Sequence, residues 1–196
     1  MSSADMLTPT LVIFSGLPGA GKSTLANQLA WDLHWPLLRI DDLVVDVSDG
    51  AGPAFWDEKI LVLLTLSEAQ LALGLSVIVD SVFMGADRVH AQEIARSHAA
   101  NFRPVYCFVS DEVLWQQRVT QRVEALQNPA VATWEQISHQ REHFAKWDAD
   151  TALFVDAILP LAQNQTKIRE YVTGQGISLK PLCIPPGGLV QGRYHG

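Results

Sequence analysis

The sequence predicts an α/β fold in which helices cover a mostly parallel β-sheet. Short apolar runs rich in β-branched residues alternate with longer segments of helical periodicity, a pattern typical of successive βα units. A glycine-rich turn joins the first of these runs to the first helical segment. With 196 residues the chain is long enough to bury one hydrophobic core, so folding needs neither a disulfide nor a structural metal.

The first predicted helix lies between two predicted strands. The strand Leu11–Ser15 is a largely apolar run, and the helix Gly21–Leu33 places leucines at every fourth position on one face. Pro36 prevents this helix from continuing, and a second strand follows over Leu37–Ile40.

The second helix is predicted over Phe55–Leu73. Gly74 follows it and suits a left-handed helix end, and the strand Ser76–Asp80 and the helix Gly85–Ala99 come next. One stripe along the second helix contains Ile60, Leu64, Ser67 and Leu71.

A fourth strand is predicted over Pro104–Val109. Ser110 or Asp111 can cap the helix that follows and continues to Ala125. Asn128-Pro129 interrupts the helical pattern, and another helix is expected over Trp134–Trp147.

The last predicted elements are the strand Ala152–Val155 and the helix Gln163–Val172. We expect residues 1–173 to form one domain. Residues 174–196 are rich in glycine and proline and are expected to form a tail without regular structure.

Composition limits the partners and the compartment. A formal net charge of −7 disfavours nonspecific binding to nucleic acid. Residues 1–10 lack the pattern of a secretory signal, and no apolar run is long enough to span a membrane, so we expect a cytoplasmic protein. Cys107 and Cys183 lack the spacing of a disulfide framework and are expected to be reduced.

Residues 16–24 contain the phosphate-binding pattern G-x-x-x-x-G-K-[ST], known as the P-loop or Walker A motif. The pattern lies directly between a predicted strand and a predicted helix, which is the context that it requires. Glycines there allow backbone N–H groups to approach an anion at a helix N-terminus. The alternative interpretation is a glycine-rich turn with a chance Lys-Ser pair.

The motif predicts a nucleoside triphosphate and Mg²⁺ as cofactors; we expect ATP, although the side chains do not distinguish ATP from GTP. Lys22 supplies charge to the β- and γ-phosphates, and the Ser23 hydroxyl ligates the metal. A switch GTPase is disfavoured because the chain lacks N-K-x-D and the third strand does not end in D-x-x-G. The expected nucleotide-binding residues of the motif are Gly16, Pro18, Gly19, Ala20, Gly21, Lys22, Ser23 and Thr24.

Three aspartates follow predicted strands, at the edge of the sheet where ligands bind in such folds. Asp80 resembles a Walker B acid that holds Mg²⁺, although it can also cap a turn. Either Asp41 or Asp42 can accept a proton from an acceptor hydroxyl, and the alternative is that both cap a short turn.

Arg118 and Arg122 are four residues apart on one predicted helix, so they share a face. We expect a lid over residues 124–148 that closes over nucleotide and brings an arginine to the transferred group. The alternative is a solvated basic face. His139 and His143 are also four apart, but the order H-E-x-x-H and a third metal ligand are missing, so we expect a solvated helix instead.

Four motifs together resemble one group of kinases: GLPGAGKST, RIDD, VIVDS and RVTQR. Over about residues 11–172 the chain is similar to P-loop kinases grouped with polynucleotide 5′-kinase, chloramphenicol phosphotransferase and the zeta toxins. The resemblance implies a P-loop NTPase fold, a three-layer αβα sandwich with a five-stranded parallel sheet of order 2-3-1-4-5 and a helical lid.

The resemblance also implies residue roles. Asp41 would be the general base, Arg122 would contact the γ-phosphate, and Arg118 would lie nearer the nucleotide base. Polynucleotide kinases carry an arginine two residues after the Asp-Asp pair for the phosphate of the acceptor. That position is Val44 here, which disfavours a phosphorylated acceptor.

The acceptor side of the site is predicted to be acidic. No Lys or Arg lies between Ile40 and Lys59, and a pocket with carboxylate walls repels a polyanion. Phe55 and Trp56 can form an apolar wall or pack in the core. The acidic residues of the window are Asp41, Asp42, Asp46, Asp49, Asp57 and Glu58.

The sequence therefore predicts an ATP-dependent kinase with a small neutral or cationic hydroxyl compound as acceptor, and no nucleic-acid or membrane partner. Two alternatives stay open. One is a nucleic-acid or nucleotide-sugar kinase of the same group, and the other is a regulatory module that binds ATP without transfer.

Overall fold

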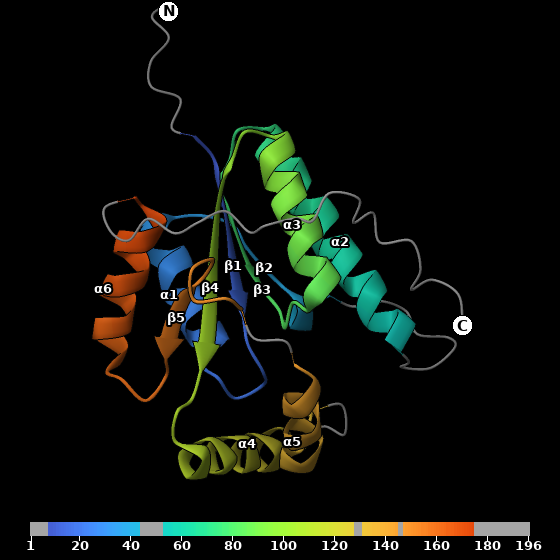
Figure 1. The fold of residues 1–196 in the computed structure, drawn as a ribbon, viewed down its shortest axis with the longest axis vertical. Coiled ribbons are helices and arrows are strands. Elements are labelled where there is room, and N and C mark those ends of the chain that lie inside the picture. Colours follow the sequence, from blue (N-terminus) through green and yellow to red (C-terminus); the bar gives the residue numbers. More distant parts are fainter. Residues whose placement is uncertain (1–7, 44–52, 128–130, 145–146, 175–196) are drawn as a thin grey trace, which may run out of the picture.

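A five-stranded parallel sheet forms the centre of the molecule (Figure 1). The computed structural model describes residues 8–43, 53–127, 131–144 and 147–174. The strand order is β2-β3-β1-β4-β5, which confirms the order expected from the sequence. The bounds are β1 Thr10–Ser15, β2 Leu37–Arg39, β3 Val77–Asp80, β4 Asn101–Phe108 and β5 Leu153–Asp156.

Helices cover both faces of the sheet, so the expected three layers are present (Figure 1). Helix α1 (Lys22–Leu33) packs beside α6 (Leu161–Val172), and α2 (Pro53–Ala72) packs beside α3 (Gly85–Ser97). Alternate residues of β1 enter different cores: Val12 and Phe14 join one cluster of buried side chains, and Leu11 and Ile13 join the other. A strand buried on both faces is typical of the centre of a parallel sheet.

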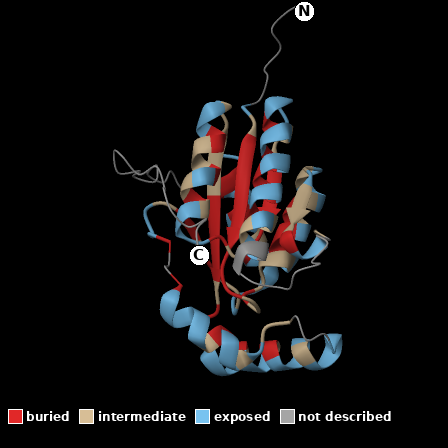
Figure 2. Ribbon diagram, turned by 90° about the vertical axis from the view of Figure 1, so that its right-hand side faces the viewer, coloured by how far each residue is buried: buried red, intermediate tan, exposed pale blue. Residues whose placement is uncertain are grey.

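Two further helices lie together beyond the carboxyl ends of the strands (Figure 1). They are α4 (Glu112–Leu126) and α5 (Trp134–His143). The side chain of Asp111 caps α4 by accepting a hydrogen bond from the Leu114 N–H at 3.0 Å. Figure 2 shows that this pair is largely exposed, whereas the strands are buried. The rings of Trp115 and Trp134 join the two helices edge to face, with centroids 5.3 Å apart.

Helix α5 is shorter than the expected Trp134–Trp147. It ends at His143, and Phe144 has an extended backbone with φ −76° and ψ 105°. Phe144 stacks on Tyr106 of β4, with ring centroids 6.0 Å apart, and Trp147 lies under the guanidinium of Arg88 at 4.5 Å. Burial of these two aromatic residues against the sheet and α3 ends the helix, which helical periodicity alone does not reveal.

Strand β4 begins at Asn101, three residues before the expected start at Pro104. Strand β5 pairs with β4 only from Val105 onward, so Pro104 has β1 as its single neighbouring strand. A proline is tolerated at such a position because no bond to a second neighbour is lost. The other boundaries differ from expectation by one or two residues.

Some expected features lie outside the described residues. These are the break at Asn128-Pro129, Cys183 and, apart from Gly174, the tail 174–196. In the described part of the chain, no helix combines the length and the apolar character needed to cross a membrane.

Candidate active site

The phosphate loop joins β1 to α1 through three glycines with positive φ. Gly16, Gly19 and Gly21 have φ angles of 139°, 80° and 79°. A Cβ atom on Gly16 would overlap the carbonyl oxygen of Cys107, and one on Gly19 would lie 2.8 Å from Cγ2 of Val119. Glycine is therefore required at both positions, because any side chain would displace the adjacent strand or helix.

Hydrogen bonds hold this loop from within and from α4. Nε1 of Trp115 donates to the carbonyl oxygen of Pro18 at 2.9 Å, although the two residues are 97 positions apart. Within the loop, the Ala20 N–H and Nζ of Lys22 each donate to the carbonyl oxygen of Leu17 at 3.2 Å. The Trp115 contact places α4 directly against the loop.

The N-terminus of α1 is available to an anion. Among the described residues, no side chain caps this helix at Gly21. The N–H groups of its first turn can therefore donate to a phosphate, at the helix end where the dipole favours negative charge.

Lys22 begins α1 and is partly buried. Burial lowers the pKa of its ammonium group, and the Asp80 and Asp41 carboxylates are among the groups that oppose this shift. A partly buried cation interacts strongly with an arriving phosphate, since less water screens the charges.

Asp80 ends β3 beside the loop, and its side chain is only 4% exposed. Its register partners are Phe14 of β1 and Arg39 of β2. Burial raises the pKa of the Asp80 carboxyl, while the Lys22 ammonium and a hydrogen bond from Ser23 act in the opposite direction. The two expected metal ligands, Ser23 and Asp80, thus lie near each other.

The oxygen atoms around Asp80 fit a hydrated Mg²⁺ ion. This ion prefers oxygen ligands and keeps several of its water molecules. Ser23 and Asp80 each offer an oxygen, and the next residue, Ser81, has a buried Oγ atom without a hydrogen-bond partner in the described part of the chain. A water molecule carried by the metal can satisfy such an atom.

The two adjacent aspartates have different partners. Both belong to η1 (Ile40–Asp42), a short 3₁₀ turn after β2. Nε and Nη2 of Arg39 donate to the two carboxylate oxygens of Asp42 at 2.8 and 2.6 Å, and this interaction lowers the pKa of Asp42. Asp41 instead lies near α4, with Oδ2 3.6 Å from Nη2 of Arg122.

Of the pair, Asp41 is the carboxylate nearer the phosphate loop. Its charge is among the causes that raise the pKa values of both Lys22 and Asp80, whereas the charge of Asp42 is not. Asp41 is also the residue that the resemblance implies as the general base, and this role stays a prediction.

Arg118 and Arg122 share one face of α4, as their spacing predicts. Nη2 of Arg118 donates to the carbonyl oxygen of Ala157 at 3.1 Å, just after β5. A Cβ atom on Gly21 would lie 3.3 Å from Cβ of Ala157, so Ala157 borders the phosphate loop. Arg118 therefore lies beside the start of α1, and Arg122 lies beside Asp41.

Trp115 is a site residue that the sequence analysis missed. It lies three and seven residues before the two arginines, so helical spacing already places it on their face of α4. Its hydrogen bond requires α4 to lie against the loop that follows β1, and no local sequence pattern reveals this tertiary contact.

The structure supports only part of the acidic wall that the sequence predicts on the acceptor side of the site. Arg39, one residue before the acidic window, binds Asp42 and neutralises much of its charge. Trp56 is 48% exposed, so its ring does not belong to the core. Three members of the expected wall lie outside the described residues, namely Asp46, Asp49 and the side chain of Phe55, and so does Val44, the position where polynucleotide kinases carry an arginine.

Residues 11–147 match the AAA domain family. The chain belongs to this family. The matched segment begins at β1 and ends beyond α5, so it contains the phosphate loop, the aspartates and both arginines described above. None of the curated proteins matches the sequence.

Solved structures of P-loop kinases share the fold of this AAA domain protein. A sugar kinase from Janibacter sp. HTCC2649 is 13% identical, with a TM-score of 0.66 and coverage of 84% of this chain and 95% of that chain. The Mycobacterium tuberculosis APS kinase CysC, in complex with AMPPNP and APS, is 16% identical, with a TM-score of 0.63 and coverage of 85% and 98%.

A third similar structure is Kti12 from Chaetomium thermophilum in complex with ADP-AlF3. It is 16% identical, with a TM-score of 0.60 and coverage of 83% of this chain and 98% of that chain. Identities this low show a common P-loop kinase fold, and membership in the subgroup with polynucleotide 5′-kinase and the zeta toxins stays a prediction.

Proposed function

We propose that this protein is an ATP-dependent kinase that transfers the γ-phosphate to a hydroxyl group of a small neutral or cationic molecule. The main support is that three groups meet at one end of the sheet: the phosphate loop, the Ser23–Asp80 pair, and Asp41 with Arg122. Phosphoryl transfer requires an anion site, a metal site and a base for the acceptor, and each group suits one of these tasks.

In this proposal ATP binds along residues 16–24, with Arg118 beside the nucleotide. The backbone N–H groups at the start of α1 and the ammonium group of Lys22 hold the phosphates. Ser23 and Asp80 hold Mg²⁺, which neutralises charge on the β- and γ-phosphates when it is bound.

Asp41 is the proposed general base. As the acceptor oxygen bonds to the γ-phosphorus, the bond between that phosphorus and the β–γ bridging oxygen breaks, and ADP leaves. The hydroxyl proton passes to a carboxylate oxygen of Asp41. Arg122 leaves Asp41 for the γ-phosphate and stabilises the charge that develops on it.

We assign the lid to residues 124–148. Helices α4 and α5 are joined by the Trp115–Trp134 contact and by an ion pair between Arg141 Nη1 and Glu112 Oε2 at 3.0 Å. Because Trp115 of α4 also binds the phosphate loop, movement of α5 relative to α4 is coupled to the nucleotide site. Closure would exclude water from the transfer reaction.

Carboxylates on the acceptor side favour an acceptor without negative charge. Burial raises the pKa of Asp87 on α3, and the charge of Asp57 on α2 acts in the same direction, so these two acidic residues are near enough to interact. Carboxylates of this kind repel an anionic acceptor. Arg39 and Arg122 already have carboxylate partners. A polyol or an amino alcohol fits this charge pattern, and the sugar kinase among the structural neighbours agrees with a polyol.

The Kti12 structure supports a second candidate function, a nucleotide-binding module, because Kti12 shares the fold and was solved in complex with ADP-AlF3. In that case the protein would bind ATP and transfer nothing. A nucleic-acid or nucleotide-sugar kinase is the remaining alternative, and the cytoplasmic location stays a prediction.

Incubation with labelled ATP and Mg²⁺ tests the proposal. The acceptor panel contains polyols, amino alcohols and 5′-hydroxyl oligonucleotides, and Asp41→Asn is the matched inactive variant. We expect transfer to a polyol or an amino alcohol by the wild-type protein. Transfer to oligonucleotides alone would overturn the assigned acceptor class, and ATP binding without transfer to any acceptor would favour the regulatory module.

A further inference from the structure

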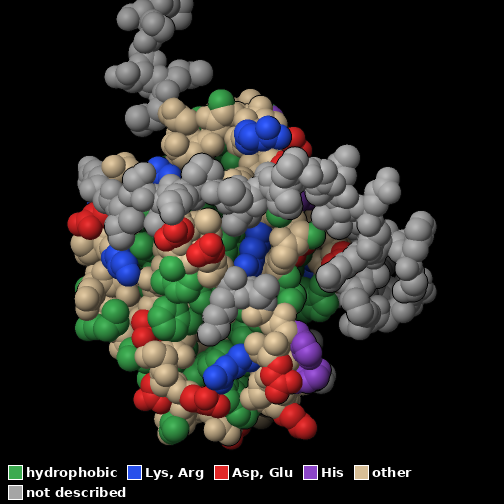
Figure 3. Space-filling model, in the orientation of Figure 1, with side chains coloured by type: hydrophobic (Ala, Val, Ile, Leu, Met, Phe, Trp, Pro, Cys, Tyr) green, Lys and Arg blue, Asp and Glu red, His purple; other side chains and the backbone are tan. Residues whose placement is uncertain are grey.

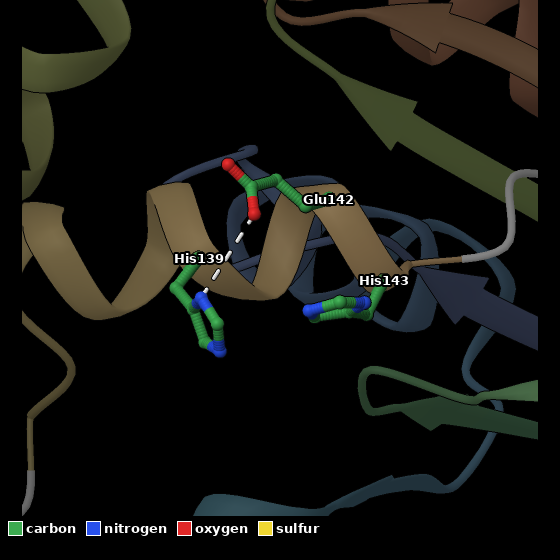
Figure 4. Close-up of side chains that lie close together, drawn as sticks. All are labelled: His139, Glu142 and His143. Carbon is green, nitrogen blue, oxygen red and sulfur yellow. Dashed lines mark ion pairs between the residues drawn. The ribbon is translucent and has the colours of Figure 1, made fainter.

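Two histidines and a glutamate gather on the surface of α5, apart from the Ser23–Asp80 pair. Figure 3 shows histidine side chains exposed together over this helix, and Figure 4 shows His139, Glu142 and His143 on its last turns. One ligand atom from each of the three residues lies within 4.8 Å of the other two. Nδ1 of His139 is 3.9 Å from Oε2 of Glu142, and the two imidazole centroids are 5.0 Å apart.

Helical spacing produces this group. His139 and His143 are one turn apart on the same face, and Glu142 is three residues after His139. Two histidines at this spacing bind zinc from one helix in the motif H-E-x-x-H, and H-x-x-E-H is a known inverse of it. Residues 139–143 have the inverse order. In those motifs the histidines bind the metal and the glutamate is a general base, whereas here the distance of the Glu142 carboxylate from both histidines allows it to be a third ligand.

We propose that His139, Glu142 and His143 bind a divalent transition-metal ion, with Zn²⁺ the best match. Imidazole nitrogen and carboxylate oxygen bind zinc at about 2.0–2.2 Å, so the ligand atoms of a tetrahedral site are about 3.4 Å apart. The three ligand atoms lie within 4.8 Å of one another, so small side-chain movements would bring them to the spacing of a zinc site. The side chains of His139 and Glu142 are 75% and 72% exposed, so rotation about their own bonds can achieve it.

The position of the group on α5 favours a cation. His143 is the last residue of the helix, where carbonyl groups without helical partners carry partial negative charge. The nearest basic residue in sequence, Arg141, does not compete for Glu142, because its Nη1 atom is 3.0 Å from Glu112 of α4. Arg141 therefore leaves the three proposed ligands accessible to a metal ion.

A metal at this position would stabilise the end of the lid. Helix α5 has ten residues, and helices of that length are marginal without tertiary support. The next residue, Phe144, is buried against Tyr106 of β4. The ion would therefore fix the end of α5 next to the contact between Phe144 and the sheet, whatever reaction the protein performs.

Isothermal titration of the metal-free, untagged full chain with ZnCl₂ tests the site. We expect His139→Ala and His143→Ala each to weaken zinc binding by about tenfold or more, and Glu142→Gln to weaken it less. His90→Ala is the matched control, since His90 is also an exposed histidine on a helix, and it should bind as the wild type does. Zinc should raise the midpoint of thermal unfolding of the wild type and leave that of the double histidine variant unchanged.

Asp80→Asn separates this site from the proposed magnesium site, because it should leave zinc binding at α5 intact. Zinc binding that is equal in the wild type and in the double histidine variant would overturn the proposal, as would the absence of binding to the wild type. Loss of all zinc binding in Asp80→Asn would assign the ion to the phosphate site and would also overturn it.

Discussion

Arg122 on α4 and Asp41 after β2 form an ion pair, with Nη2 of the arginine 3.6 Å from Oδ2 of the aspartate. Both side chains are substantially exposed, so the pair stabilises the fold little and separates easily. A γ-phosphate offers Arg122 more negative charge and more acceptor oxygens than one carboxylate does. In the proposed kinase, nucleotide binding therefore draws Arg122 away and leaves Asp41 free to take the proton of the acceptor.

Asp41→Asn should lower kcat by at least about a hundredfold, because an amide cannot accept the hydroxyl proton. Affinity for ATP should be kept, since Asp41 does not hold the phosphates. Asp42→Asn is the matched control: its carboxylate binds Arg39, so kcat should change little. Steady-state kinetics with ATP titrations distinguish the two variants, and equal losses in both would contradict the role of Asp41.

Substitutions of the two arginines of α4 should change different kinetic constants. Arg122→Ala should lower kcat by at least about a hundredfold, because the guanidinium group that stabilises charge on the transferred phosphoryl group is removed. Arg118→Ala should chiefly raise KM for ATP, since Arg118 lies beside the start of α1 and bonds Ala157. Measurement of kcat and KM for both variants checks this division, and an unchanged kcat in Arg122→Ala would exclude contact with the γ-phosphate.

Gly19→Ala should abolish ATP binding and destabilise the fold. The new Cβ atom would lie 2.8 Å from Val119 and 3.0 Å from Nε1 of Trp115, which positions the loop. Gly74→Ala provides the control, because its φ of 75° is similar but no atom lies within 4 Å of the new Cβ. That variant should lose about 1–2 kcal/mol from backbone strain and keep full ATP affinity. Thermal unfolding and ATP calorimetry measure the two effects, and ATP binding by Gly19→Ala would contradict the loop geometry.

Cys107 should resist alkylation in the folded protein. Burial raises the pKa of its thiol to about 12, so at pH 8 only about one molecule in ten thousand carries the reactive thiolate. Reactivity should rise as the pH increases toward that value and should be rapid at pH 8 after unfolding. A Cys183→Ser variant isolates the signal of Cys107 in a thiol assay. Rapid reaction of the folded variant at pH 8 would contradict the buried environment.

Local patterns were sufficient to predict the strands, most helices and the phosphate loop, whereas the strand order came from the resemblance to P-loop kinases. Leu11–Ser15 and the leucines of α1 identify the strand and the helix, and the glycine spacing identifies the loop between them. These features depend on neighbours in the chain, so the sequence displays them directly.

Features that depend on distant contacts were not predictable in the same way. The two aspartates differ through tertiary contacts, because Asp42 binds Arg39 and Asp41 pairs with Arg122 of α4. Likewise, only the fold brings Trp115 to Pro18. The early end of α5 has the same origin, since Phe144 leaves the helix to pack on Tyr106. Side-chain pairing and tertiary burial decide such details, and periodicity does not report them.

The central claim is that the phosphate loop binds a nucleoside triphosphate through Lys22 and the start of α1. Calorimetry with ATP and Mg²⁺ tests it most directly, with Lys22→Ala as the variant and Lys167→Ala as the control, because Lys167 is exposed and lies on α6. We expect ATP to bind the wild type and the control equally and to lose its affinity for Lys22→Ala. Absence of binding to the folded wild type, or equal binding to all three proteins, would contradict the account.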